Sequence, residues 1–240
     1  MLQFIGRGSA FNTEEGNNSA FFIHEGELVL IDCGSNIFDR LKKSGILRTI
    51  KNIRVLITHT HPDHIGSLGD LIFYSYFKMG NMGVKNLTVY APYVLKVPKI
   101  MKCMGVTTDY YHIKQFDSGI DMLFEGNEIK VSNVPSSHVS ELLSYGYLIT
   151  VKDTVIYYSG DSNKIPRLML DLLNKGVIQY FYQDTSYADY PGNVHLSLNK
   201  LCELVPEHRD KVYCMHLDEG FEEFLAVDYG FNVVHNAFKF

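Results

Sequence analysis

A stretch of six residues carries three histidines and one aspartate, at His59, His61, Asp63 and His64. It follows the apolar run 53–57, whose β-branched residues predict a buried strand. Side chains two positions apart on an extended segment point the same way, so His59 and His61 can bind one metal ion. A proline then turns the chain into a helix, which projects Asp63 and His64 toward a second ion. These ligands suit zinc, manganese, iron or cobalt, and two such ions about 3.5–4 Å apart can clamp a phosphoryl group.

Further histidines and aspartates in the second half of the chain are candidates for the same chemistry. They are His138, Asp161, Asp184, His195 and His216. Apolar, strand-like runs precede His138, Asp161, Asp184 and His216, and ligands gather at the carboxyl ends of strands in layered α/β folds. Each one alone is more simply explained as a cap or a hydrated surface group. Together with the first cluster, they predict a metal site.

Asp32 ends another apolar run, 27–31, and the sequence leaves two roles open for it. In the first role its carboxylate lies behind the metal site and orients a ligand histidine. In the second role it caps the helix that the following segment predicts.

Apolar runs and helical patterns alternate along the chain with no linker between the halves. Strands are expected at 3–6, 20–23, 27–31, 53–57, 87–90, 128–134, 145–151, 154–158, 177–182 and 211–215, and helices at 37–43, 68–78, 93–104, 165–173 and 197–205. The polar segment 13–18 is expected to be a mobile loop. Because both halves supply candidate ligands, we expect one domain over residues 1–240, with two sheets packed face to face and helices outside.

Composition narrows the class of protein. Hydrophobic residues make up 46% of the chain, and 22 basic residues against 27 acidic ones give a net charge of −5. That charge balance argues against a protein that binds nucleic-acid backbones, which normally requires a basic surface. No apolar run approaches membrane-spanning length, no signal-peptide pattern opens the chain, and the four cysteines form no CxxC pair. We therefore expect a cytoplasmic protein that does not bind membranes.

The segment 59–64 matches the HxHxDH signature, and on this motif the chain resembles metallo-β-lactamase fold hydrolases. The resemblance implies an α/β fold, a four-layer αββα sandwich, with two Zn²⁺ ions, or Mn²⁺ or Co²⁺ in their place. It assigns one ion to His59, His61 and His138, the other to Asp63, His64 and His216, and makes Asp161 the bridge between them. Such a pair of ions would activate a shared water for attack on phosphorus.

The branch it resembles is ribonuclease Z and its phosphodiesterase relatives. The pointers are the N-terminal segment 5–10, aspartate at Asp161, and His195 within Val-His-Leu-Ser. In these relatives a histidine paired with an acid contacts the phosphate and can protonate the leaving oxygen. The resemblance assigns that pair to His195 and Asp184 and places Asp63 in the catalytic set. The family's usual acid is glutamate, so Asp184 departs from the pattern, and His195 has the alternative of a histidine at the start of a helix.

One departure bears on the substrate. Transfer-RNA processing relatives carry a flexible arm between the positions of His138 and Asp161, whereas here a predicted hairpin fills that segment. Without that arm, the chain resembles the compact anti-Pycsar phosphodiesterases of phages. That similarity implies hydrolysis of 3′,5′-cyclic mononucleotides (cCMP, cUMP, also cAMP and cGMP) and a homodimer. For a phage product, the cytoplasmic location would be the cytoplasm of the host. A tRNA 3′-end endonuclease and a non-catalytic nucleotide sponge are the alternatives.

A cyclic nucleotide also needs an aromatic surface for its base. Four tyrosines in polar, loop-like context are candidates: Tyr110, Tyr111, Tyr187 and Tyr190. Four remaining histidines are expected to have no metal role: His24, His112, His208 and His235.

Overall fold

The computed structural model describes residues 1–124 and 127–240, and within these residues the strands form two sheets. The six-stranded sheet runs in the order β1 (Gln3–Gly6), β2 (Ser19–His24), β3 (Glu27–Ile31), β4 (Ile53–Leu56), β5 (Leu87–Pro92) and β6 (His112–Phe116). The seven-stranded sheet runs in the order β13 (Asn232–Val233), β12 (Val212–Met215), β11 (Tyr180–Asp184), β10 (Thr154–Tyr158), β9 (Tyr145–Val151), β8 (Asn127–Pro135) and β7 (Gly119–Phe124).

Both sheets are mixed in the same way. β1, β2 and β3 pair antiparallel, whereas β3 to β6 pair parallel. In the other sheet β7 to β10 pair antiparallel and β10 to β13 pair parallel. Because parallel strands all end at the same edge of a sheet, each sheet gathers several strand ends at one place.

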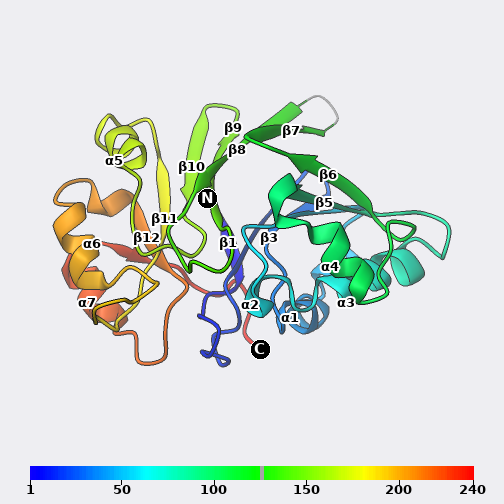
Figure 1. Cartoon of the computed structure of the whole chain (residues 1–240), viewed down its shortest axis with the longest axis horizontal. Coiled ribbons are helices and arrows are strands. Elements are labelled where there is room, and N and C mark those ends of the chain that lie inside the picture. The colour runs from blue at the N-terminus through cyan, green and yellow to red at the C-terminus, as the bar shows by residue number, and fades with distance from the viewer. Residues whose placement is uncertain (125–126) are drawn as a thin grey trace.

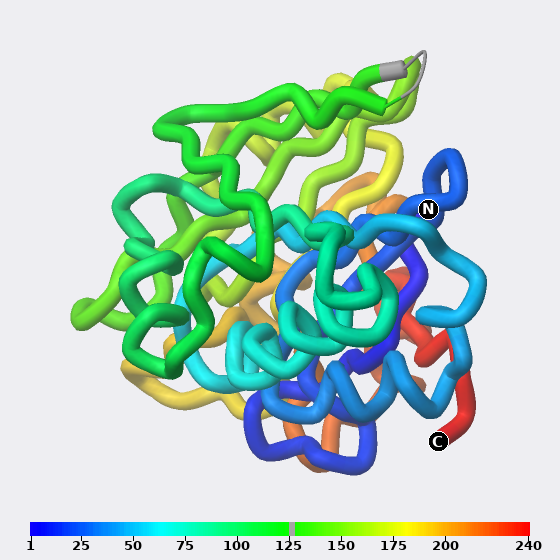
Figure 2. Tube along the Cα trace, turned by 90° about the vertical axis from the view of Figure 1, so that its right-hand side faces the viewer, coloured from blue at the N-terminus to red at the C-terminus, as the bar shows by residue number. Residues whose placement is uncertain are grey.

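Helices cover the outer face of each sheet, as Figure 1 shows. On one side lie α1 (Ile37–Ser44), α2 (Pro62–Ile65), α3 (Leu68–Tyr74) and α4 (Val97–Cys103), and on the other lie α5 (Arg167–Asn174), α6 (Leu198–Leu204) and α7 (Glu223–Asp228). Short η segments span Ile46–Arg48, Ser75–Met79, Tyr93–Leu95 and Arg209–Lys211. Figure 2, viewed from the side of the first group, shows those helices in front of the strands. The expected αββα sandwich is confirmed.

Three apolar clusters follow from this layering. The middle one lies between the sheets and joins Ile31 and Leu56 of the first to Tyr147 and Tyr182 of the second. The Tyr147 hydroxyl also donates a hydrogen bond to the Ile57 carbonyl, so the two sheets are linked by polar as well as apolar contact.

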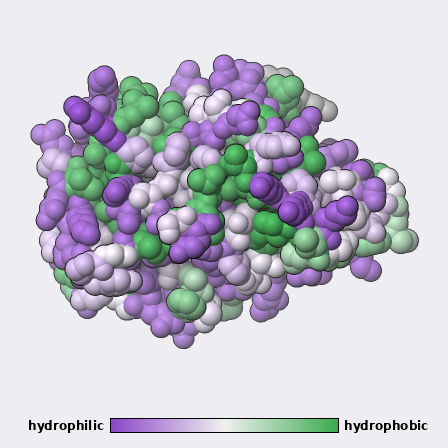
Figure 3. Space-filling model, in the orientation of Figure 1, coloured by the Kyte–Doolittle hydropathy of each residue, from purple (hydrophilic) through white to green (hydrophobic). Residues whose placement is uncertain are grey.

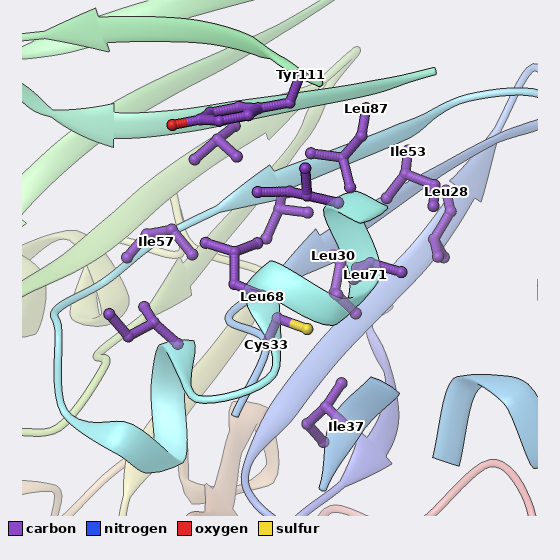
Figure 4. Close-up of a cluster of buried hydrophobic side chains, with 14 of the residues drawn as sticks. Leu28, Leu30, Cys33, Ile37, Ile53, Ile57, Leu68, Leu71, Leu87 and Tyr111 are labelled. Carbon is purple, nitrogen blue, oxygen red and sulfur yellow. The ribbon is translucent and has the colours of Figure 1, made fainter. Parts of the chain in front are cut away.

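The two outer clusters attach the helices. Figure 4 shows one of them, where Leu68 and Leu71 of α3 point at strand residues that include Leu30 and Leu87. Side chains three positions apart share one helix face, which explains why this pair meets the sheet together. The other cluster packs α5, α6 and α7 on the second sheet through Met169, Leu201 and Ala226, among others.

Several elements differ from the expectation. β6, β7, α7 and β13 were not predicted. β6 and β7 each bury only one side chain fully, so few apolar residues mark them as strands. The expected strand 177–182 begins three residues later, since residue 177 still belongs to the turn that closes α5. The expected helix 68–78 leaves α geometry after Tyr74.

The polar segment 13–18 is fastened at several points, contrary to a free loop. Arg7 forms an ion pair with Glu15 at 2.6 Å, and the Gly8 amide donates to the Gly16 carbonyl at 2.7 Å. The buried Arg40 guanidinium donates to the carbonyl of Glu14 at 2.5 Å. These bonds fix the loop against β1 and α1.

Among the residues that the structure describes, no helix has the length and apolarity needed to cross a membrane. On the face shown in Figure 3, apolar residues gather in separate patches among polar ones.

Candidate metal centre

Six strands end at the candidate site. His59, His138 and Asp161 each lie three residues beyond the last residue of β4, β8 and β10. Asp184 is the last residue of β11, and His216 directly follows β12. The helix α2 supplies Asp63 and His64, and β3 ends immediately before Asp32. The seven residues expected to bind metal are thus brought together by two sheets and one short helix.

Three histidines form the first set of donor atoms. His61 Nδ1 lies 3.1 Å from His59 Nε2 and 3.2 Å from His138 Nε2. Asp161 Oδ2 lies 3.8 Å from both of those Nε2 atoms. Donors at about 2.1 Å from a tetrahedral zinc ion would lie roughly 3.4 Å apart, so this spacing fits such an ion.

The second set shares the Asp161 carboxylate. His64 Nε2 lies 3.3 Å from Asp63 Oδ2 and 3.3 Å from Asp161 Oδ1. His216 Nε2 lies 3.5 Å from Asp63 Oδ2 and 3.4 Å from Asp161 Oδ2. One carboxylate therefore faces both sets, which is the arrangement that a bridging ligand requires.

Buried atoms without partners give a separate test of whether metal fits. Among the described residues, His64 Nε2, His216 Nε2 and Asp161 Oδ1 are buried and have no hydrogen-bond partner. Leaving a buried polar atom unpaired costs about 1–3 kcal/mol of stability. Three such atoms in one place therefore indicate that a bound group contacts all of them. All three belong to the second set. The donor sets therefore point to divalent metal binding.

The far ring nitrogens of these histidines are held by the protein. His64 Nδ1 donates to Asp32 Oδ2 at 2.8 Å, and His138 Nδ1 donates to the Val194 carbonyl at 3.3 Å. His59 Nδ1 lies 3.0 Å from the Thr58 hydroxyl. Each contact fixes the ring orientation and leaves the other nitrogen free for a metal.

This geometry decides between the two roles left open for Asp32. Its carboxylate accepts hydrogen bonds from the Thr58 amide at 2.8 Å and the Thr58 hydroxyl at 2.7 Å, besides the bond from His64. The N-cap of α1 is Asn36. Asp32 therefore orients a candidate ligand and does not cap the helix.

Two residues of the centre and one neighbouring glycine have left-handed backbone. Asp32 and His216 have positive φ angles of 64° and 58°, and Gly160, next to Asp161, has 58°. A Cβ at Gly160 would also lie 2.5 Å from the Tyr145 carbonyl oxygen. Left-handed backbone is unfavourable for residues other than glycine and occurs most often at functional sites.

Charge is balanced locally. Burial lowers the pKa of His64 and His216, but the surrounding carboxylates outweigh burial and raise both pKa values well above the usual range. Burial raises the pKa of Asp161, and the neighbouring imidazoles bring it well below its usual range. Burial holds the pKa of His59 well below normal, which favours the neutral, metal-binding form. The surrounding positive charge thus stabilises the ionised form of the buried carboxylates.

Asp184 joins the metal centre to His195. Its Oδ2 accepts from His195 Nδ1 at 2.7 Å and from the Ser162 amide at 2.8 Å, while its Oδ1 lies 3.3 Å from His216 Nδ1. Burial lowers the pKa of His195, and the Asp184 carboxylate reverses the direction and raises it. The two residues expected to form a catalytic pair are therefore in hydrogen-bond contact.

We expect Asp32→Asn to weaken metal binding at the second set by about 10- to 100-fold, since the amide removes the charge that orients His64. Competition with a chromophoric chelator measures this affinity. Asp121→Asn, at an exposed position on β7, is the matched control. An unchanged affinity in Asp32→Asn would contradict the assigned role.

Gly34→Ala is expected to destabilise the fold by about 1–3 kcal/mol and to disturb the Asp63 loop. An added Cβ would lie 1.9 Å from the Asp63 carbonyl oxygen. This is a backbone atom, so relieving the clash requires a shift of the main chain. Chemical denaturation measures the loss, with Gly83→Ala as control because its nearest neighbour would be 3.9 Å away. Equal stability of the two variants would contradict the prediction, because it would mean that the Asp63 loop shifts to accommodate the Cβ without cost.

The remaining histidines and the tyrosines considered for base stacking lie outside the two donor sets. Within the described part of the chain, no metal-type cluster contains the four histidines expected to have no such role, His24, His112, His208 and His235. Tyr111 is buried in the cluster of Figure 4, and Tyr110 packs against Phe73 and Phe77. Neither tyrosine has an exposed ring on which a base could stack. Tyr187 and Tyr190 are exposed.

Sequence reasoning missed the supporting contacts of Thr58 and the Val194 carbonyl, and also Phe11 in the N-terminal loop. The first two act through one hydroxyl and one backbone atom, which no motif marks. Phe11 is 84% exposed beside His195, a placement that depends on the tertiary fold.

Comparison with known proteins identifies relatives over nearly the whole chain. A family model described as anti-Pycsar protein Apyc1 matches residues 1–238. Anti-Pycsar protein Apyc1 of Bacillus phage BSP38 is 29% identical, covering 94% of this chain and 91% of the relative. The protein of the same name from Saccharibacillus brassicae is 30% identical and covers 94% and 93%.

Solved structures share the fold at low sequence identity. The metallo-β-lactamase fold protein YhfI from Bacillus subtilis has a TM-score of 0.74 at 16% identity, covering 99% of this chain and 97% of that one. The short form of human tRNase Z has a TM-score of 0.70 at 16% identity, covering 98% and 95%. Zn²⁺-bound PqqB from Methylobacterium extorquens has 0.70 at 13%, covering 99% and 98%.

Proposed function

The chain belongs to the anti-Pycsar protein Apyc1 family, and from this membership and the metal centre we propose that it hydrolyses 3′,5′-cyclic mononucleotides to nucleoside monophosphates. It is a metal-dependent hydrolase that acts on phosphodiester bonds. Destruction of such nucleotides would counteract a defence that uses them as its signal. The observation that carries the proposal is one carboxylate, Asp161, facing two donor sets beside a histidine–carboxylate pair.

In this proposal two Zn²⁺ ions are held, with Mn²⁺ or Co²⁺ as replacements. The first set would be His59, His61 and His138, the second Asp63, His64 and His216, with Asp161 shared. When bound, the ions supply Lewis acidity toward the phosphoryl oxygens and an activated water. The carboxylates of Asp63 and Asp161 offset the positive charge, and the fixed rings keep the donors in place.

His195 then acts on the leaving group. Its Nδ1 donates to Asp184, so Nε2 is the nitrogen that can carry a proton toward the substrate. As the bond between phosphorus and a ribose oxygen breaks, this proton passes to that oxygen and yields a hydroxyl. General acids of this kind contribute about 10²- to 10⁴-fold to the rate. By raising the pKa of His195, Asp184 favours the imidazolium, in which Nδ1 and Nε2 each carry a proton.

Incubation of pure metal-loaded protein with cCMP, cUMP, cAMP and cGMP tests the function. We expect linear monophosphates from these nucleotides and no cleavage of precursor tRNA. β9 and β10 lie within the sheet and fill the segment where tRNA-processing relatives carry an arm. Four intact nucleotides would reject the proposal; cleaved tRNA would favour the endonuclease, and bound but uncut nucleotide would favour a sponge.

A homodimer and a cytoplasmic location, which is the host cytoplasm if the chain is phage-encoded, stay predictions. Light scattering on the purified protein tests the first, and fractionation of infected or expressing cells tests the second.

A further inference from the structure

We propose that a cavity bordered by Phe11 and Tyr190 binds the nucleobase of the substrate. The cavity has a volume of about 310 Å³, and its lining also includes His195 and His216. A volume of this size suits part of a small molecule. The inference rests on the function proposed above and assigns the base to one side of the metal centre.

The position of His195 determines which side the base must take. Whichever phosphodiester bond breaks in a 3′,5′-cyclic nucleotide, the leaving oxygen belongs to the ribose. The ribose must therefore lie next to His195, the group that protonates that oxygen. Since the base is attached to the ribose, it extends into a space adjoining His195, and this cavity is lined by that residue.

A second cavity near the centre does not meet this condition. It has a volume of about 370 Å³ and is lined by His138, Leu142 and Leu143, among others, but not by His195. A base placed there would contact His138 and not the proton donor itself. Leu143 is 58% exposed, so its side chain offers a matched control at the competing position.

The two aromatic rings suit a stacking role. Phe11 is 84% exposed and Tyr190 is 55% exposed. A single exposed aromatic is ordinary on a protein surface, whereas two at one cavity beside a catalytic histidine offer faces on which a base can stack.

The backbone that carries Phe11 is fastened, so the ring is presented from a fixed position. The Ser9 amide donates to the Leu217 carbonyl at 2.9 Å, and Asn12 Nδ2 donates to the same carbonyl at 3.1 Å. The ion pair between Arg7 and Glu15 holds the loop farther along.

Polar side chains of the lining are already engaged with the protein. Asp218 accepts hydrogen bonds from the amides of Tyr187 at 2.7 Å and Ala188 at 3.1 Å. Asn193 Nδ2 donates to the Ala188 carbonyl at 2.8 Å, and its Oδ1 accepts from the His195 amide at 3.0 Å. These groups shape the segment around Tyr190 and are not free to read the edge of a base. We therefore assign the contact with the base to the faces of the two rings.

Steady-state kinetics of Phe11→Ala and Tyr190→Ala test the assignment, with cCMP and cAMP as substrates. Each variant is expected to raise KM about tenfold, within the range of base–aromatic stacking, with kcat near the wild-type value. Phe11→Tyr and Tyr190→Phe keep a ring and are expected to retain KM. Leu143→Ala is expected to behave as wild type.

A base-free ribose 3′,5′-cyclic phosphate separates this subsite from the metal centre. The alanine variants should hydrolyse it as well as the wild type does, because it has no base to stack. Wild-type KM for cCMP and cAMP in both alanine variants, or a raised KM in Leu143→Ala alone, would overturn the assignment. Failure of the wild type to cut any of these compounds would instead reject the proposed function.

Discussion

Asp161→Asn is expected to lower kcat/KM for cyclic nucleotides by at least about 1,000-fold. The carboxylate faces both donor sets, with Oδ1 3.3 Å from His64 Nε2 and Oδ2 3.4 Å from His216 Nε2. An amide keeps the shape but supplies only one oxygen and no charge. Metal catalysis contributes several kcal/mol of transition-state stabilisation, and each 1.36 kcal/mol is a factor of ten in rate.

Metal content per chain, measured alongside activity, shows whether the loss of kcat/KM results from weaker metal binding. We expect Asp161→Asn to hold less metal than the wild type while its circular dichroism spectrum remains native. Asp171→Asn, on the exposed face of α5, serves as the control. A variant with full metal content and wild-type activity would show that Asp161 does not bridge the two sets.

His195→Ala is expected to lower kcat for cyclic nucleotides by about 10²- to 10⁴-fold with metal content unchanged. The ring donates to Asp184 at 2.7 Å and stacks near His216 at a centroid distance of 4.8 Å, so it lies beside the centre without being in either main donor set. Its loss should therefore affect proton transfer more than metal binding.

The leaving group distinguishes proton transfer from a structural effect. Bis(p-nitrophenyl) phosphate releases a weakly basic phenolate that needs little protonation. We expect His195→Ala to retain most of its activity on this diester while it loses activity on cCMP. His208→Ala, a histidine outside the centre, is the control. Equal losses on both substrates would contradict a general-acid role for His195.

The sequence predicted the parts of the site that motifs and strand ends mark. His59, His61, Asp63 and His64 form a local cluster, and His138, Asp161 and His216 each follow an apolar run, so their convergence followed from the layered architecture. The contact between Asp184 and His195 was also expected, although aspartate replaces the usual acid there.

Tertiary contacts decided the rest. Asp32 offered two roles, and the 2.8 Å contact with His64, together with Asn36 at the N-cap of α1, separates them. β6 and β7 each bury only one side chain fully, so few apolar residues mark them as strands in the sequence. The segment 13–18 was expected to be mobile, because nothing local reveals that Arg7 and Arg40 hold it in place.

Metal reconstitution tests the central claim most directly. Protein stripped with a chelator is titrated with Zn²⁺ or Mn²⁺ while cCMP hydrolysis and bound metal are followed together. We predict no hydrolysis without metal and a rate that reaches its maximum at two ions per chain. Full activity in the stripped protein, or a maximum already at one ion per chain, would contradict a centre built around a bridging Asp161.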